Sequence, residues 1–324
     1  MKNTKNVAKL TTATDFDLKS YLNTCINLRP DSLIMDDIKW KYMVRSALRG
    51  KNILLLGPTG CGKTLAAQTV AKAIGREDNF FYFNLGATQD ARSALIGNTH
   101  FDKKTGTLFK ESSFIKAIRT PNAIILLDEI SRSHHDGVNI LMTVLDDLQR
   151  YLRLDEKEDS EVVKVADGVT FIATANVGNE YTATRVMDRA LLSRFPVKIE
   201  VTPLDKDSEY NLLKNRFNLN SDGQLETLKA VCEIADHTRK QVKQDDSKLT
   251  NFIPTRSTVE IAELIVDGFN LLEIAETTIY PNFSDDGGVD SERTYVRQLV
   301  QKYVKVESKD KLFNDPLKSD QPPF

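Results

Sequence analysis

The chain has few cysteines, no long apolar run and almost no net charge. Its three cysteines, Cys25, Cys61 and Cys232, are odd in number and far apart, so they indicate neither a disulfide framework nor a zinc ribbon. A reduced, cytoplasmic setting is therefore expected. No apolar stretch approaches the length of a membrane span, and the polar first residues lack the apolar core of a secretion signal. These absences argue against a membrane protein and against a disulfide-stapled secreted domain.

The charge balance also limits the expected partners. The net charge is −2 and the pI is about 6.2, so no global positive field attracts nucleic acid or an anionic membrane. A local basic groove remains compatible with this balance, and nucleic acid is therefore an open but not favoured partner. The 324 residues, 40% of them hydrophobic, are enough for a sizeable core and two domains.

Short apolar runs recur through the first two thirds of the chain, with helical stretches between them. Continuous apolar strands that alternate with helices are typical of a parallel sheet covered on both faces, and so of an α/β fold. A helix with apolar spacing is expected at residues 36–49, before the first strand. The expected strands are residues 52–56, 80–85, 123–127, 169–175 and 196–201.

Two insertions interrupt this alternation. Residues 98–110 and residues 151–165 each contain two strand-like pieces around a polar turn, so both are expected to be β-hairpins. The acidic tip of the second, residues 155–161, is interpreted as a solvated turn rather than a binding surface.

The pattern changes to helices after residue 201, which predicts a small helical lid domain that follows the sheet in the sequence. The expected helices are residues 204–217, 225–238, 256–274 and 291–304, with a turn-rich linker at 282–291. The expected organisation is a flexible arm (1–34), an α/β domain (35–203), a helical lid (204–305) and a disordered tail (306–324).

The segment from Gly57 to Thr64, GPTGCGKT, is the most informative in the chain. It follows an apolar strand and precedes the helical stretch 65–74, and it fits the phosphate-binding loop G-x-x-x-x-G-K-[ST]. The glycines let backbone N–H groups converge on phosphate oxygens, the lysine is expected at the β- and γ-phosphates, and the threonine hydroxyl at Mg²⁺. Cys61 is interpreted as a spacer. The expected nucleotide-binding residues here are Gly57, Pro58, Thr59, Gly60, Cys61, Gly62, Lys63, Thr64 and Leu65.

Polar residues end two later strands. Asp128 and Glu129 follow an apolar run, at the end of a strand where ligands bind in open α/β sheets. Asp128 is expected to hold the Mg²⁺ hydration shell, and Glu129 to orient and polarise the attacking water. Asn176 ends the strand at 169–175, and its amide is expected to reach the γ-phosphate or that water, a role that Thr174 could share.

Three arginines are candidates for contacts with the nucleotide. Arg189 and Arg194 lie near the end of a helix, where a guanidinium could reach a nucleotide held by a neighbouring subunit, although each could instead make a surface salt bridge. Arg256 begins a lid helix, where a positive charge is slightly unfavourable, and it could contact phosphate.

Two other patterns are given a structural interpretation. The adjacent His134 and His135 would diverge on a helix, so a zinc site is not expected there. A stripe of apolar residues is interpreted as helix core. The stripe consists of Val138, Leu141, Met142, Leu145 and Leu148.

Taken in order, the segments GPTGCGKT, LLDEIS, ATAN, ALLSRF and PTRS resemble those of AAA+ ATPases, in particular the MoxR-like group. LLDEIS followed by Arg132 is similar to that group's DEINR signature, with Ser131 in place of the usual Asn, and the two hairpins stand where the group carries insertions. The resemblance spans residues 35–275. It implies a hexameric ring with ATP at subunit interfaces and a protein partner, which in this group often has a von Willebrand A domain. Chelatase motor subunits are relatives, and MCM-type helicases share the insertions.

Three functions are compatible with these observations. The favoured one is a Mg²⁺-dependent ATPase that remodels a protein client. A nucleic-acid motor or loader would instead be stimulated by DNA or RNA and bind it in a salt-sensitive way. A nucleotide-gated scaffold would bind ATP with little turnover, which Glu129 and the candidate arginines argue against.

Overall fold

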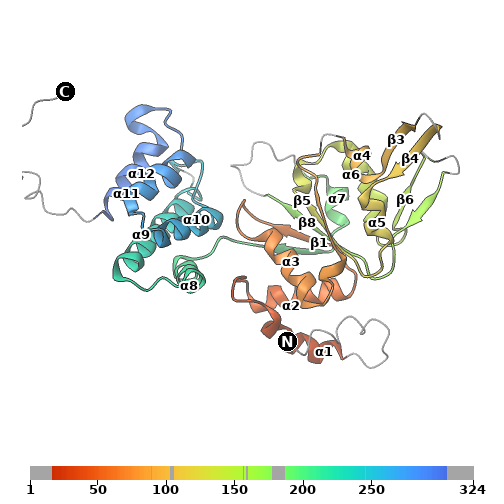
Figure 1. The fold of residues 1–324 in the computed structure, drawn as a ribbon, viewed down its shortest axis with the longest axis horizontal. Helices are drawn as coiled ribbons and strands as arrows, with labels where there is room; N and C mark the ends of the chain where they lie inside the picture. The colour runs from red at the N-terminus through yellow and green to blue at the C-terminus, as the bar shows by residue number, and fades with distance from the viewer. Residues whose placement is uncertain are drawn as a thin grey trace, which may run out of the picture. The chain divides into compact units, whose positions relative to one another are not determined.

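A computed structural model describes residues 17–88, 90–102, 106–155, 157, 160–176, 187–244 and 246–304 of the chain. These residues form two compact units, and each has a hydrophobic core of its own (Figure 1). The first unit comprises residues 1–204 with 254–256, and the second comprises residues 205–253 with 257–324. Within the described residues, no helix is both long and apolar enough to cross a membrane.

The first unit is built on a five-stranded sheet in which every neighbouring pair is parallel. The strand order is β2-β5-β8-β1-β9, so the first strand of the sheet in sequence lies between the last two. The strands are β1 (Ile53–Leu56), β2 (Phe80–Asn84), β5 (Ile124–Asp128), β8 (Thr170–Ala175) and β9 (Val197–Glu200). All five lie within or at the edge of the expected apolar runs.

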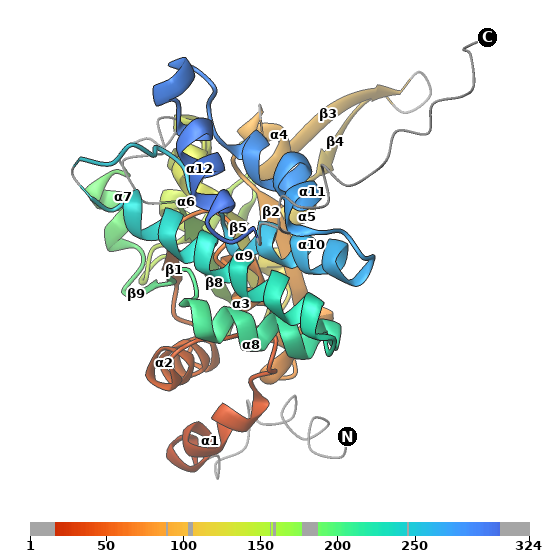
Figure 2. The ribbon, with the colours of Figure 1, turned by 90° about the vertical axis from the view of Figure 1, so that its left-hand side faces the viewer.

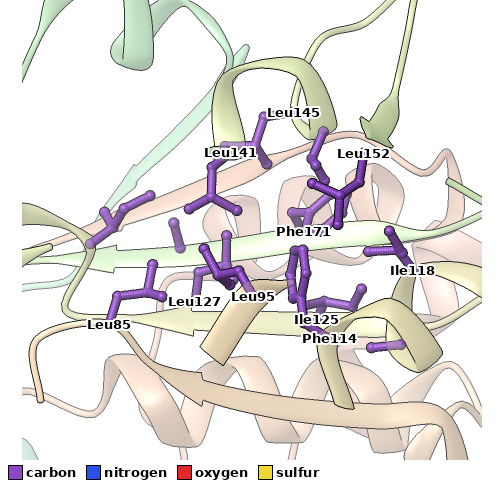
Figure 3. Close-up of a cluster of buried hydrophobic side chains, with 14 of the residues drawn as sticks. Leu85, Leu95, Phe114, Ile118, Ile125, Leu127, Leu141, Leu145, Leu152 and Phe171 are labelled. Carbon is purple, nitrogen blue, oxygen red and sulfur yellow. The ribbon is translucent and has the colours of Figure 1, made fainter. Parts of the chain in front are cut away.

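Side chains that alternate along each strand supply the cores on both faces of the sheet. Ile53 and Leu55 pack with helices α2 (Asp37–Leu48) and α3 (Lys63–Ala73). Leu54 points to the opposite face, where Phe114, Leu141 and their neighbours form the core drawn in Figure 3. That face is covered by α4 (Ala91–Leu95), α5 (Ser113–Arg119) and α6 (His135–Val144). The central strands β1, β5 and β8 are therefore buried on both sides, and a ligand site is expected in the loops at the carboxyl ends of the strands.

Both insertions form two-stranded antiparallel hairpins, β3 (Gly97–Asp102) with β4 (Gly106–Glu111) and β6 (Tyr151–Arg153) with β7 (Val162–Lys164). Residues 103–105, at the tip of the first, lie outside the described residues. The acidic tip of the second hairpin is expected to be a solvated turn, but Glu161 at this tip makes ion pairs. Its carboxylate pairs with Arg119 and Lys157, and both of these cations also pair with Glu111 at the end of β4.

The second unit consists of helices around one apolar core, and α8 and α9 lie side by side (Figure 2). Its helices are α8 (Lys206–Phe217), α9 (Asp222–Gln241), α10 (Thr255–Val266), α11 (Leu271–Ile274) and α12 (Glu292–Gln301). The single helix expected at 256–274 is broken in two. Gly268 adopts φ +93°, which ends one helix, and the Asn270 side chain caps the next by accepting from the N–H groups of Leu272 and Glu273.

Two further expectations differ from the structure. Residues 17–34, expected to belong to a flexible arm, contain α1 (Leu18–Thr24) and bury Cys25 and Leu33 in the core beneath α2, where the indole of Trp40 donates to the Cys25 carbonyl at 2.8 Å. Leu148, expected in the helix core, is 94% exposed because α6 ends at Val144. The rest of the expected arm (1–16) and tail (306–324) lies outside the described residues.

Candidate nucleotide-binding site

The loop after β1 has the backbone that an anion site needs. Gly57 donates its N–H to the Ala175 carbonyl at 3.2 Å, and a Cβ at Gly57 would lie 2.0 Å from the Val201 carbonyl oxygen, so only glycine fits there. Gly62 caps α3 in a left-handed conformation (φ +92°) and contributes no side chain to its first N–H groups. The positive end of α3 is therefore available to a negatively charged group.

Lys63, the first residue of α3, is buried, including its ammonium group. Its Nζ donates to the carbonyls of Gly57 (2.8 Å) and Pro58 (2.6 Å) and to Oδ1 of Asn176 (2.8 Å). These three acceptors are neutral, and burial lowers the pKa of the Lys63 ammonium because the charged form loses solvation. The ammonium is thus held in position by oxygens that do not neutralise it.

Asp128 receives hydrogen bonds from three hydroxyl groups. Tyr82 Oη lies 3.0 Å and Thr64 Oγ1 lies 3.4 Å from Oδ2 of Asp128, while Thr174 Oγ1 donates to Oδ1. The threonine hydroxyl and the carboxylate are oxygen ligands of the kind that Mg²⁺ prefers, and Mg²⁺ commonly takes its remaining ligands from water and phosphate. This pair of side chains therefore fits a magnesium ion that accompanies a nucleotide.

Glu129 follows β5 in a left-handed conformation, with φ +56°. Its backbone N–H donates to Thr174 Oγ1 at 2.9 Å, which ties the turn to β8. One carboxylate oxygen lies 3.3 Å from Nη1 of Arg132. The same oxygen would be 2.3 Å from a Cβ at Gly86, so the carboxylate occupies space that a larger residue at Gly86 would fill.

The structure brings five of the expected site residues together at the carboxyl ends of the strands. Hydrogen bonds link Lys63 to Asn176 and Thr64 to Asp128, and Glu129 shares Thr174 with Asp128. The rest of the loop lies alongside: Gly60, Pro58 and Cys61 are partly buried, whereas Thr59 and Leu65 are exposed. Cys61 donates its thiol to the Pro58 carbonyl at 3.0 Å, and burial raises its pKa, so the thiolate is disfavoured.

The three candidate arginines lie on other elements. Arg194, at the end of α7 (Arg189–Ser193), pairs with Asp146 at 3.2 Å, and its Nε donates to the Met142 carbonyl at 3.3 Å. Arg189 is exposed at the first position of α7, and Arg256 is exposed at the second position of α10. Their expected contacts with phosphate remain predictions.

Two residues near this site have no site role among the expectations from the sequence. Tyr82 contributes a hydroxyl to Asp128, and Arg132 pairs with Glu129. Arg132 stands three residues after Glu129, a spacing that favours contact on a helical turn, so a signal for it existed. Tyr82 carries no such signal, because its position beside Asp128 depends on the pairing of β2 with β5.

This sheet order, the glycine loop after β1 and the acidic pair at the end of β5 together define an AAA+ nucleotide-binding domain. Residues 52–195 match the family described as "AAA domain (dynein-related subfamily)". "Putative chaperone BssE" of Thauera aromatica is 30% identical over 223 residues, which cover 68% of this chain and 72% of that protein. An uncharacterized protein of Staphylococcus aureus (strain USA300) is 32% identical over 216 residues, covering 65% and 74% of the two chains. The chain belongs to this AAA family.

A solved structure has the same fold. The closed-state reconstruction of Hsp104 with ATPγS and FITC casein matches with a TM-score of 0.50 and 16% identity, over 66% of this chain and 41% of that one. At this level of identity the likeness concerns the fold alone. Members of the AAA+ class bind nucleotide and generally hydrolyse ATP, and the AAA domain here retains the loop and the acidic pair that those activities use.

Proposed function

We propose that this chain is a Mg²⁺-dependent ATPase that works as an oligomeric ring, of MoxR-like type, and remodels a protein client. Lys63 and the loop backbone bind the phosphates, Glu129 orients and polarises the attacking water, and Asn176 contacts the γ-phosphate. Arg194, with Arg189 as the second candidate, completes the site of a neighbouring protomer, and Arg256 contacts phosphate from the start of α10. Residues 35–203 act as the nucleotide-binding domain and residues 204–305 as the helical lid.

The arrangement of Lys63 and Asn176 is the observation that carries this proposal. A buried ammonium that is hydrogen-bonded only to neutral oxygens in its three short contacts is incompletely compensated, and a phosphate group supplies the missing negative charge. Asn176, at the other end of one of those bonds, is freed for the γ-phosphate when the lysine turns to the nucleotide. Both residues lie at the end of the sheet where α/β proteins bind ligands.

Thr64 and Asp128 would hold the magnesium ion. Their hydroxyl and carboxylate groups already face one another at 3.4 Å, which supports the assignment. The ion, when bound with the nucleotide, supplies positive charge to the phosphate oxygens. The chain itself contributes the loop N–H groups, the Lys63 ammonium and the Glu129 carboxylate. The backbone of Glu129 is fixed by the hydrogen bond from its N–H to Thr174.

The client and the assembly rest on family evidence. The name of the Thauera aromatica relative supports a chaperone-like role. The MoxR-like resemblance of the ordered motifs supports a hexamer and a protein partner, for which a von Willebrand A domain is the expected class. Because the active site of such a ring includes a residue from the next protomer, assembly should be needed for turnover.

The central test is the substitution Glu129→Gln. It removes the carboxylate that polarises water and keeps the side-chain shape, so ATP binding should stay within about twofold of the parental value while turnover falls by about 10²- to 10⁴-fold. Binding is measured by calorimetry with Mg·ATP, and turnover by phosphate release. Glu77→Gln, at an exposed acid of the turn before β2, is the matched control and should leave both unchanged.

The same variant can identify the client. Held in the ATP-bound form, the ring should retain a protein partner that affinity capture recovers, and Glu77→Gln should not. Hydrolysis by Glu129→Gln at the parental rate would refute the role given to Glu129. Stimulation of the parental ATPase by DNA or RNA, with no protein retained, would replace the remodelling function with that of a nucleic-acid motor.

A further inference from the structure

Tyr82 stands on the outer strand of the sheet, next to the acidic residue of the site. Strand β2 has a neighbour only on the β5 side within the five-stranded sheet, and its register pairs Tyr82 with Leu126 and Asn84 with Asp128. Phe81 and Phe83, on either side of Tyr82, pack against the core on the opposite face of the sheet. Strand alternation therefore places Tyr82, which is 48% exposed, on the other face. There its hydroxyl donates to Asp128 at 3.0 Å.

The three hydroxyl groups that donate to Asp128 differ in their other contacts and expected roles. Thr64 has the longest bond, 3.4 Å, and in the proposed function it binds the metal directly. Thr174 donates to Oδ1 and also accepts from the backbone of Glu129, so it links the two acids to β8. Tyr82 is the remaining donor to Oδ2, the oxygen that faces Thr64. It therefore fixes the carboxylate oxygen nearest to the expected metal position.

We propose that Tyr82 is a positioning residue of the metal half of this nucleotide site, which holds Oδ2 of Asp128 in the orientation that Mg·ATP binding requires. This inference rests on the proposed function. The bond joins a neutral donor to a charged acceptor, and such bonds are stronger than those between neutral groups.

The substitution Tyr82→Phe tests this role, because it removes only the hydroxyl. Dissociation constants of a fluorescent ATP analogue are measured by titration in excess Mg²⁺ and, separately, in EDTA. The constant in Mg²⁺ should rise about three- to tenfold, a range set by a half-exposed bond to a carboxylate, and the constant in EDTA should stay unchanged. The Mg²⁺ concentration that gives half-maximal ATPase activity should rise by a similar factor.

Tyr42→Phe is the matched control, because Tyr42 is also an exposed tyrosine, on α2 of the same unit. It should change neither constant. A merely structural role of Tyr82 would weaken binding equally in Mg²⁺ and in EDTA, and would lower the unfolding midpoint. Three results for Tyr82→Phe would overturn the proposal. They are equal weakening in both media, parental binding in both media, and tighter binding in Mg²⁺, which is expected if the phenol competes with the metal.

The wild-type protein separates this inference from the proposed function. If it binds ATP in neither medium, the proposed function fails, and the role of Tyr82 fails with it. If it binds ATP more tightly with Mg²⁺ and Tyr82→Phe retains the full metal effect, only the role of Tyr82 is wrong.

Discussion

Lys63 and Arg239, two of the buried cations in the described residues, are stabilised in opposite ways. Lys63, in the first unit, is 7% exposed, and Arg239, in the second, is 6% exposed. The three short hydrogen bonds of Lys63 go to neutral oxygens. Arg239 instead forms a bidentate pair with Glu209, with N···O distances of 2.8 and 2.9 Å, and its Nε donates to the Ile253 carbonyl at 2.9 Å.

Under the proposed function, this difference separates a binding residue, Lys63, from a structural one, Arg239. Glu209 also accepts from the Thr258 hydroxyl at 2.7 Å, so both charges of the buried pair are matched within the second unit. This group of side chains joins α8, α9 and α10, and no ligand is needed to balance its charges. Lys63 has no such match in its short contacts, and burial lowers the pKa of its ammonium. Neutral acceptors alone do not mark an anion site, because the buried Arg76 also donates to the carbonyls of Ala47 and Gly168. For Lys63 the additional argument is its place in the glycine loop at the start of α3.

The largest expected effect is on stability, from Arg239→Met. The substitution leaves the Glu209 carboxylate buried without its partner, so the free energy of unfolding of the second unit should fall by about 3–5 kcal/mol. Urea unfolding measures the loss. Lys240→Met is the matched control. Lys240 is the next residue of α9 and its side chain is 71% exposed, so the loss of its pair with Asp236 should change stability little.

A double variant sharpens this result. Adding Glu209→Leu to Arg239→Met removes the unpaired carboxylate, and most of the lost stability should return, because apolar replacements of a buried pair are often neutral. If the single substitution has no effect, the pair does not hold the second unit together and the contrast with Lys63 disappears.

The second effect, on binding, comes from Lys63→Met. Loss of a buried ammonium that contacts phosphate should raise the dissociation constant of Mg·ATP on the order of 100-fold, as measured by calorimetry. The free energy of unfolding without nucleotide should stay the same or rise, because the buried charge contributes unfavourably there. This is the opposite of the result for Arg239.

Lys72→Met provides the comparison within the same helix, since Lys72 is an exposed residue near the end of α3. It should alter neither binding nor stability. Strong destabilisation of the nucleotide-free protein by Lys63→Met would mean that Lys63, like Arg239, is a structural cation, and would contradict its assignment as a phosphate ligand.

The sequence predicts the local features of this fold well, because each depends on a short stretch of chain. Strands β1, β5 and β8 are buried on both faces, and so they stand out as apolar runs at Ile53–Leu56, Ile124–Asp128 and Thr170–Ala175. The loop before Lys63 stands out because its chemistry demands glycine at fixed spacing. The expected roles of Asn176 and the arginines remain predictions.

Features that depend on pairing between distant segments cannot be predicted from local sequence patterns. Tyr82 meets Asp128 only because β2 lies next to β5, and Arg239 meets Glu209 only because α8 packs on α9. Residues 18–24 were missed for a different reason: this short helix has no fully buried side chain, so its composition resembles that of an exposed segment. The break at Gly268 was missed because the apolar spacing continues on both sides of it.

The smallest expected effect concerns Arg194, a cation that is less buried than Lys63 and Arg239. Its side chain is 32% exposed and pairs with Asp146 at 3.2 Å. A partly exposed pair contributes little, so releasing Arg194 toward a neighbouring protomer should be easy. Asp146→Asn keeps the oxygen that accepts from the N–H groups of Leu148 and Gln149, and it should change ATPase activity by no more than about twofold.

Arg194→Ala is the reference for that measurement, because loss of an arginine that acts on the neighbouring site should lower turnover by about 10³-fold. The two variants are compared by phosphate release at a protein concentration where the ring is assembled, verified by light scattering. A much smaller loss of turnover for Asp146→Asn than for Arg194→Ala means that the pair with Asp146 is not needed when Arg194 acts on the neighbouring site. Equal losses would mean that Asp146 holds Arg194 in its working position, and Arg194 would then join Arg239 as a cation whose partner lies within its own chain.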